Sequence, residues 1–570
     1  MILQALYEFY ERSKDTLPVL GRELKEIGFL IVIDKDGIFL RFEDRRIDKK
    51  HAQRFLVKKQ VGRTSAPVAN YLYDNSAYVF GYSDKGDANS CQKYLDIFKD
   101  KVQAIYFAAS DNVDLKAVNN FYKQDMAAIR TKMSEDPLWE EIVKNLNKKF
   151  SVFSLLIEGD SRIVAEKAEL LDLLNNNQED KGDSICLVSG KRGSLVETTT
   201  ATMIPGSQAT AKLVAFQVDS GYDSYGKEKC GNAPISEEAE FAYTTALNFM
   251  LRSDSRNKFL IGNRTFLFWA SKNDEAGAQA EESIFNMFGF ADEEDDPNRN
   301  IEQVRKTFNA IYSGSLKTSL DDKFYILGLA PNSARIAVTY WAELPLKEFA
   351  ALILRHFEDM EIADTRKEKK PYSGLRSILA AVTLGGKSSD ATPNLPEAVV
   401  KSIFQGVPYP YTLFAGCIRR IRAEQSLNIT RAAIIKAYLN RNDNQQKIQV
   451  MLDKENTNQG YLCGRLFAVL DKIQGEANNQ HSIRERYMNS ASATPAAVFA
   501  TILNLSNHHS EKLSEPRKIW FEKVKQEIID KISPDGFPAH LDLQDQGRFF
   551  VGYYQQTQDF FTKKDEQETE

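Results

Sequence analysis

Cysteine pairs and long apolar runs are both missing from this 570-residue sequence. Its five cysteines are scattered without a CxxC pair, which fits a reducing compartment and argues against a zinc knuckle or ribbon. No run of about 18 apolar residues occurs, so we predict no membrane span. The first residues carry acids early and lack the basic-then-apolar form of a signal peptide. We therefore expect a cytoplasmic protein without a membrane partner.

Catalytic motifs are scarce as well. The six histidines form no HExxH or HD pattern. His356 and His509 each stand two residues before a glutamate, as in zinc deaminases, but no PCxxC follows, so we expect both on helix surfaces. Residues 384–388 resemble the end of a phosphate-binding loop, but Ala381 stands where its first glycine belongs. The sequence therefore predicts a binding protein with no catalytic residue, metal site or cofactor.

The charge of the chain is unevenly distributed. The total is −5, yet the segment from Arg41 to Arg63 holds nine basic residues against three acids, a local charge of +6. Basic side chains at this density repel one another unless a polyanion neutralises them, and a phosphate backbone is the commonest such partner. Asn70, Tyr71 and Asn75 follow, and an asparagine amide suits adenine or a minor-groove acceptor. The alternative is a solvated basic loop beside a strand-rich piece of core.

Two further segments are candidates for phosphate contacts. The turn Gly190–Gly193 contains Lys191 and Arg192, and it either cradles a phosphate or forms an exposed hairpin tip. Residues 413–441 hold six cations against the single acid Glu424. On amphipathic helices these cations would either line a groove that follows a phosphate backbone or form a solvated face. The six are Arg419, Arg420, Arg422, Arg431, Lys436 and Arg441.

The pattern of apolar residues predicts a multidomain α+β protein. We expect a mixed α/β N-terminal region over residues 1–289, followed by an acidic, proline-containing linker over 290–300. Residues 301–400 form an α+β middle segment, in which a β-hairpin and a helix over 323–360 suit half of a ferredoxin-like fold. Residues 401–570 are predicted to form a C-terminal helical bundle.

Blocks along almost the whole sequence are similar to one known family. They include MILQALYEFYER (1–12), RTSAPVANYLYDNSAYVFG (63–81), PYPYTLFAGCIRRIRAE (408–424), SASATPAAVFATILNLSNHH (490–509) and FPAHLDLQDQGRFFVGYY (537–554). With these blocks in order, the chain resembles the large subunit of the type I-C CRISPR Cascade, a crRNA-bound surveillance complex. The stretch 196–204 lacks the polar pattern of that family, so we assign it no role.

The resemblance implies a non-catalytic protein whose partners are crRNA, double-stranded target DNA and the displaced single strand. Such a subunit recognises a protospacer-adjacent motif (PAM), promotes R-loop formation, guides the non-target strand and recruits a helicase–nuclease. The Cascade backbone and crRNA-processing subunits and a small subunit are further implied partners. By this carry-over, the basic residues between 419 and 441 contact the non-target strand. The residues assigned to the motif site are Lys58, Lys59, Arg63, Asn70 and Asn75.

The same resemblance implies that the small subunit is made from an internal start within the gene. Met451 is the candidate start, and its product of 120 residues is long enough for a helical bundle. Two other interpretations stay open. One is a nucleic-acid-processing enzyme with an unrecognised active site, and the other is a scaffold whose basic segments face acidic partners.

Overall fold

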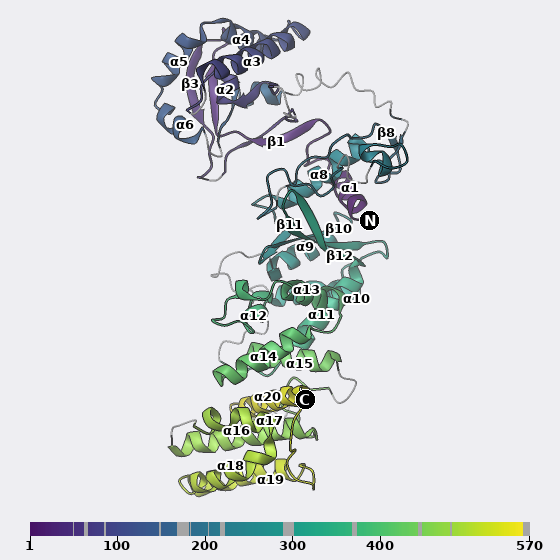
Figure 1. The fold of residues 1–570 in the computed structure, drawn as a ribbon, viewed down its shortest axis with the longest axis vertical. Coiled ribbons are helices and arrows are strands. Elements are labelled where there is room, and N and C mark those ends of the chain that lie inside the picture. Colours follow the sequence, from purple (N-terminus) through teal and green to yellow (C-terminus); the bar gives the residue numbers. More distant parts are fainter. Residues whose placement is uncertain are drawn as a thin grey trace. The chain divides into compact units, whose positions relative to one another are not determined.

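The computed structural model describes residues 1–49, 51–61, 67–84, 87–146, 150–167, 182, 184–202, 204–216, 223–288, 301–366, 373–442, 447–478 and 482–562. The chain divides into two compact units (Figure 1). The N-terminal unit comprises residues 10–200 and 216–246, and the C-terminal unit comprises residues 1–9, 201–215 and 247–570. The predicted α+β class and the helical C-terminal region are confirmed. The predicted acidic linker, 290–300, lies outside the described residues.

Four strands form the central sheet of the N-terminal unit, in the order β3-β2-β6-β5. They are β2 (Phe29–Ile33), β3 (Phe39–Asp44), β5 (Tyr73–Asn75) and β6 (Val152–Ile157). Every residue of β2 is buried. This strand lies between an antiparallel neighbour, β3, and a parallel one, β6, and helices pack against the sheet. A separate ribbon pairs β1 (Arg22–Glu26) with β4 (Arg54–Lys58). The basic segment therefore extends from β3 through β4.

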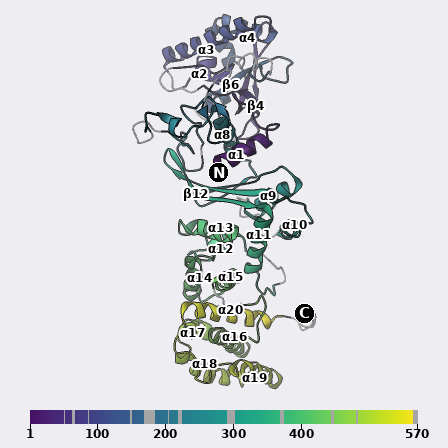
Figure 2. The same cartoon turned by 90° about the vertical axis from the view of Figure 1, so that its right-hand side faces the viewer.

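Helices cover this sheet. Both α2 and α4 contact β6, and Figure 2 shows α2 beside that strand. Their bounds are α2 (Ser76–Val79), α3 (Ala88–Ala108), α4 (Val113–Lys123), α5 (Met126–Ser134) and α6 (Trp139–Asn145). Asp87, Asn112 and Asp125 begin α3, α4 and α5, because each side chain accepts a backbone N–H of the first turn. Shorter elements complete the unit. They are β7 (Ser184–Ile185), β8 (Arg192–Gly193), the 3₁₀ turns η1 (Val164–Glu166) and η2 (Lys229–Asn232), and residues 237–246 of α8 (Glu237–Leu251).

The C-terminal unit contains a four-stranded antiparallel sheet in the order β12-β11-β10-β9. Its strands are β9 (Lys258–Ile261), β10 (Arg264–Ala270), β11 (Lys323–Asn332) and β12 (Arg335–Pro345). The predicted hairpin and helix are confirmed as β11, β12 and α11 (Leu346–Met360). The ferredoxin-like order does not occur within the described residues. One hairpin, β9–β10, precedes α9 (Glu275–Phe288) and α10 (Ile301–Ser313), and a second hairpin, β11–β12, follows them. In a ferredoxin-like fold, single strands and helices would alternate at the ends of the motif.

Helices dominate the described chain from residue 373 onwards. They are α12 (Leu375–Ala380), the 3₁₀ turn η3 (Ser388–Asp390), α13 (Leu395–Gln405), α14 (Tyr411–Glu424), α15 (Ile429–Asn442), α16 (Gln459–Asn478), α17 (Ser482–Ala493), α18 (Pro495–Ser510), α19 (Glu515–Ile529) and α20 (Leu543–Asp559). The remaining helix, α1 (Ile2–Arg12), begins the chain. The apolar faces of the major helices between α12 and α20 meet in one continuous core with the sheet of this unit.

Two helices of the C-terminal bundle, α16 and α20, approach each other very closely (Figure 2). A Cβ added at Gly464 would lie 1.9 Å from the carbonyl oxygen of Phe549, so only glycine permits this contact between backbones. The buried guanidinium of Arg465 donates to Gln556 of α20 at 3.0 Å and to Glu527 of α19 at 2.9 Å. The C-terminal helices are therefore held together by contacts among themselves.

Candidate nucleic-acid interface

Arginines of the basic segment between residues 41 and 63 form ion pairs with carboxylates from other parts of the N-terminal unit. Arg41 contacts Glu158 at 2.7 Å, and Arg54 contacts Glu26 at 3.5 Å. The expectation that a polyanion must neutralise this segment is therefore corrected for these arginines. The counter-charges come from residues that are distant in sequence, which a local count of charges does not include.

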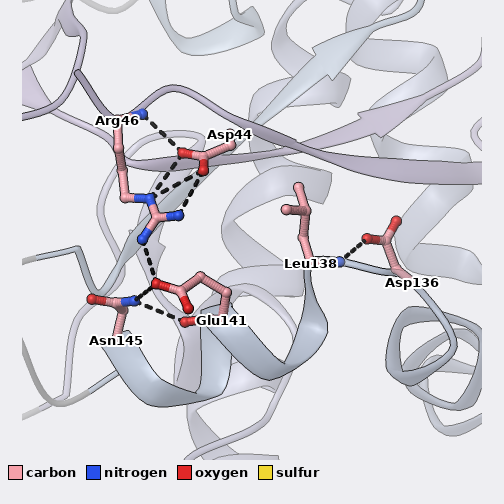
Figure 3. Close-up of polar contacts among 6 residues, drawn as sticks. All are labelled: Asp44, Arg46, Asp136, Leu138, Glu141 and Asn145. Atoms are coloured by element: carbon pink, nitrogen blue, oxygen red, sulfur yellow. Dashed lines mark hydrogen bonds and ion pairs between the residues drawn. The ribbon is translucent and has the colours of Figure 1, made fainter. Parts of the chain in front are cut away.

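Figure 3 shows how Arg46 is held. Its Nη2 contacts Asp44 at 2.7 Å, and its Nη1 contacts Glu141 of α6 at 2.6 Å. Glu141 also accepts from the side-chain amide of Asn145 at 3.1 Å. The hydrogen bond from Arg46 lowers the pKa of Glu141. Burial acts to raise the pKa of Asp44, but the hydrogen bonds from Arg46 lower it on balance. Arg46 therefore joins the end of β3 to α6.

A pocket of about 380 Å³ lies beside Lys59. The Lys59 ammonium donates to the hydroxyl of Thr200 at 3.0 Å and lies 3.7 Å from the carboxylate of Glu240. Glu197 and Glu237 also line this pocket. Lys59, which the resemblance assigns to the motif site, thus has a carboxylate partner inside the fold.

The oxygens of the two candidate asparagine amides accept hydrogen bonds inside the fold. Asn70 is 4% exposed, and its Oδ1 accepts from the backbone N–H of Val61 at 2.9 Å. Asn75 caps α2, because its Oδ1 accepts from the backbone N–H groups of Ala77 at 3.1 Å and Tyr78 at 3.4 Å. Each asparagine therefore has a structural role whatever else it contacts.

Lys58 lies in a cluster that no local pattern in the sequence indicates. Its ammonium lies over the ring of Tyr71, 4.2 Å from the centroid, and Lys101 of α3 lies over the same ring at 4.0 Å. Burial lowers the pKa of both lysines, and the charge of Lys58 lowers that of Lys101 further. Lys101 has no local cluster of basic residues to mark it, so only its packing against Tyr71 reveals it. Arg63 lies outside the described residues.

Lys191 and Arg192 belong to the exposed tip of the β7–β8 hairpin, which is the alternative that the sequence left open. Gly190 has a φ of +70°, and its N–H donates to the carbonyl of Cys186 at 2.9 Å. The ammonium of Lys191 lies 4.0 Å from Glu238, and both side chains are exposed. The hairpin tip is confirmed, and a phosphate contact there stays a prediction.

Three of the six cations between residues 419 and 441 have buried side chains. They are Arg431, Lys436 and Arg441. Arg441 Nε donates to Asp359 at 2.6 Å, and Lys436 donates to the backbone carbonyl of Glu358 at 3.2 Å. The six cations therefore do not share one exposed face, because α15 is buried on most of its circumference and its cations satisfy internal acceptors.

The other three cations lie on α14. Arg420 pairs with Glu424, which also pairs with Arg431 of α15. Arg419 is exposed and Arg422 is half-buried, and burial lowers the pKa of Arg422. In the part of the chain that the structure describes, neither Arg419 nor Arg422 forms an ion pair. Of the three cations on α14, Arg419 is the exposed one.

His356 is a core residue, which corrects the expectation of a helix-surface position. It is fully buried on α11, and its Nδ1 lies 2.8 Å from the hydroxyl of Tyr409. Burial, with a smaller effect from the charge of Arg441, lowers the pKa of His356 to about 3. Among the described residues, no group of three His, Cys, Asp or Glu side chains is arranged to hold a metal ion. The described helices include none that is long and apolar enough to cross a membrane.

Comparison with known proteins places this α+β chain among the CRISPR-associated proteins. The matching family is described as CRISPR-associated protein (Cas_Csd1), and the match covers residues 6–561. Because it spans nearly the whole chain, the chain belongs to the Cas_Csd1 family, the large subunit of the type I-C Cascade. A search of curated proteins found no match.

Proposed function

We propose that this chain is a non-catalytic subunit that recognises a protospacer-adjacent motif in duplex DNA and promotes R-loop formation. The family match over residues 6–561 carries the proposal. In RNA-guided effectors, base pairing with the guide reads the sequence, while protein reads the short motif and the duplex shape. The proposed partners are crRNA, target duplex, displaced strand, the other Cascade subunits and a helicase–nuclease. The proposed location is the cytoplasm, where these partners meet.

We assign motif recognition to the predicted N-terminal region, residues 1–289. Arg63, Asn70 and Asn75 come from the asparagine-rich block, while Lys58 and Lys59 come from the basic segment before it. In this assignment Asn70 or Asn75 contacts a base edge and the basic residues hold flanking phosphates, which suits Lys58, a half-buried lysine that shares a tyrosine ring with a second lysine. Lys59 would have to leave Glu240 to contact a phosphate. The hairpin tip with Lys191 and Arg192 is the next candidate reader.

DNA binding by the crRNA-loaded complex tests the assignment. Targets would carry or lack the flanking motif, at two salt concentrations, with wild-type protein and a Lys59→Ala, Arg63→Ala, Asn70→Ala variant. A Lys93→Ala, Lys99→Ala variant removes the same charge from α3 and serves as the control. Loss of motif discrimination in the first variant alone supports the assignment. Retained discrimination with a uniform loss of affinity would show that these residues only hold phosphates.

We further propose that Arg419 and Arg422 contact the non-target strand. Neither forms an ion pair among the described residues, so a phosphate would not displace an internal partner. Charge reversal by Arg419→Glu should destabilise the R-loop at low salt. Lys401→Glu, on the exposed side of α13, provides a control with the same charge change. An unchanged R-loop lifetime in Arg419→Glu excludes this contact.

The C-terminal helices are the proposed source of a separate small subunit that starts at Met451. The close contact of α16 with α20 and the buried Arg465 lie entirely within residues 451–570. Intact-mass analysis of the purified complex should show a species of 120 residues. Met451→Leu should remove that species and leave the full-length chain. A complex that never contains the shorter species would contradict the proposal.

The competing function is a nucleic-acid-processing enzyme. Incubation of the isolated chain with labelled DNA and RNA in the presence of Mg²⁺ or Mn²⁺ decides between the two. Cleavage that persists through purification and disappears with a chelator would overturn the non-catalytic assignment.

A further inference from the structure

One tyrosine ring in the N-terminal unit is shared by two lysines from distant parts of the sequence. Lys58 ends β4 and Lys101 lies in α3, and their ammonium nitrogens are 4.2 and 4.0 Å from the centroid of Tyr71. These two distances place the nitrogens no more than about 8 Å apart. The ring attracts each ammonium through its quadrupole. It therefore fixes two positive charges close together.

Lys101 differs in its charge environment from the arginines of the neighbouring basic segment. Arg41, Arg46 and Arg54 each have a carboxylate partner. Lys101 forms no ion pair among the described residues. The charge of Asp74 acts on Lys101 and raises its pKa, and the oxygens of Asp74 accept the backbone N–H groups of residues 70 and 75.

Two ammonium groups at this separation repel each other, and partial burial weakens the screening by water. Burial lowers the pKa of both lysines, and Lys58 lowers that of Lys101 further. A bound anion would act against both effects, because it adds a negative charge beside the two ammonium groups. Lysine contacts phosphate as a flexible point charge, so the pair suits backbone phosphates better than base edges.

We propose that Lys58 and Lys101, held by the ring of Tyr71, form a phosphate clamp on duplex DNA. The clamp rests on the proposed function only in taking DNA as its ligand. It would contact one phosphate or two neighbouring ones, and it would position the duplex without reading its sequence. Lys101 is thereby a DNA-positioning residue contributed by α3.

Salt-dependent DNA binding by the crRNA-loaded complex tests the clamp. Lys101→Met removes the charge and keeps an apolar side chain on Tyr71. Lys99→Met makes the same change two residues earlier, on the opposite side of α3. Duplexes with and without the flanking motif are titrated over a series of salt concentrations. For Lys101→Met, the slope of log K against log salt should become shallower by about 0.9, because one phosphate contact is lost.

The same fractional loss of affinity is expected on both duplexes, and Lys99→Met should match wild type. Lys101→Arg keeps the charge and should restore the wild-type slope. An unchanged slope in Lys101→Met would overturn the clamp, as would a loss confined to duplexes with the motif. If wild-type protein shows no motif discrimination, the proposed function fails, but the slopes still decide the clamp. If Lys101→Met does not fold, an unchanged slope for Lys58→Met overturns the clamp instead.

Discussion

Arg46 and Glu141 are 95 residues apart in the sequence, yet their Nη1 and Oε1 atoms are 2.6 Å apart in the structure. This ion pair joins the end of β3 to α6 (Figure 3). It shows that a segment with a local charge of +6 is partly neutralised from within the fold. The phosphate-binding capacity of the segment is therefore smaller than its composition indicates.

Arg46→Met should destabilise the N-terminal unit at neutral pH by about 1 kcal/mol, since the pair is partly exposed. Arg46 lowers the folded-state pKa values of Asp44 and Glu141. Its contribution is therefore full above their ordinary values of 3.8 and 4.5, and it is lost as pH falls through the lower folded values. Hydrogen exchange of β2 and β3 amides should show the two proteins converging in acid. A constant difference down to pH 2 would contradict the ion-pair explanation.

Gly464→Ala should disrupt the packing of α16 on α20, because the added Cβ would lie 1.9 Å from the carbonyl oxygen of Phe549. We expect a loss of about 3 kcal/mol, typical of severe overpacking. Gly475→Ala, at a half-exposed position of the same helix, should stabilise it by about 0.5 kcal/mol. Thermal unfolding of the two variants measures the contrast. Equal melting temperatures would show that the helices separate at little cost.

Asn75→Ser separates base reading from helix capping. Serine caps a helix nearly as well as asparagine but has no amide to pair with a base edge. The variant should keep the wild-type melting temperature and lose motif discrimination if Asn75 contacts a base. Asn75→Ala, which removes the cap, should also cost about 1 kcal/mol in the free energy of unfolding. Full discrimination by Asn75→Ser would leave Asn75 with a structural role alone.

Glu240→Gln tests whether Lys59 can contact a DNA phosphate. The substitution removes the carboxylate 3.7 Å from Lys59, while the amide oxygen can still accept the N–H of Thr200. If the released lysine contacts a phosphate, the variant should bind duplex DNA more tightly, with a salt slope steeper by about 0.9. Glu348→Gln makes the same charge change at an exposed site in the first turn of α11. Identical binding by the two variants would remove Lys59 from the interface.

The elements that could be predicted from the sequence are those with strong local patterns. Residues 323–360 alternate and then follow a helical period, and they form the expected hairpin and helix. The order of strands in that sheet was not predictable, because β9 and β10 are short and join the hairpin after two intervening helices. Lys101 was not predicted as part of the interface either, because its contact with Tyr71 is distant in sequence. Its neighbours in the sequence form an ordinary amphipathic helix, and its partner ring lies 30 residues away.

By itself the sequence determined the family, the mixed fold class and the positions of the basic residues, because each depends on the local order of residues and on composition. Only the tertiary structure decided which of those charges face solvent. Arg431, Lys436 and Arg441 have the same chemistry as Arg419, yet they are buried on internal acceptors. The physical reason is that the interaction energy of a cation depends on its burial and on the nearest opposite charge. Both are set by residues that folding brings together from far along the chain.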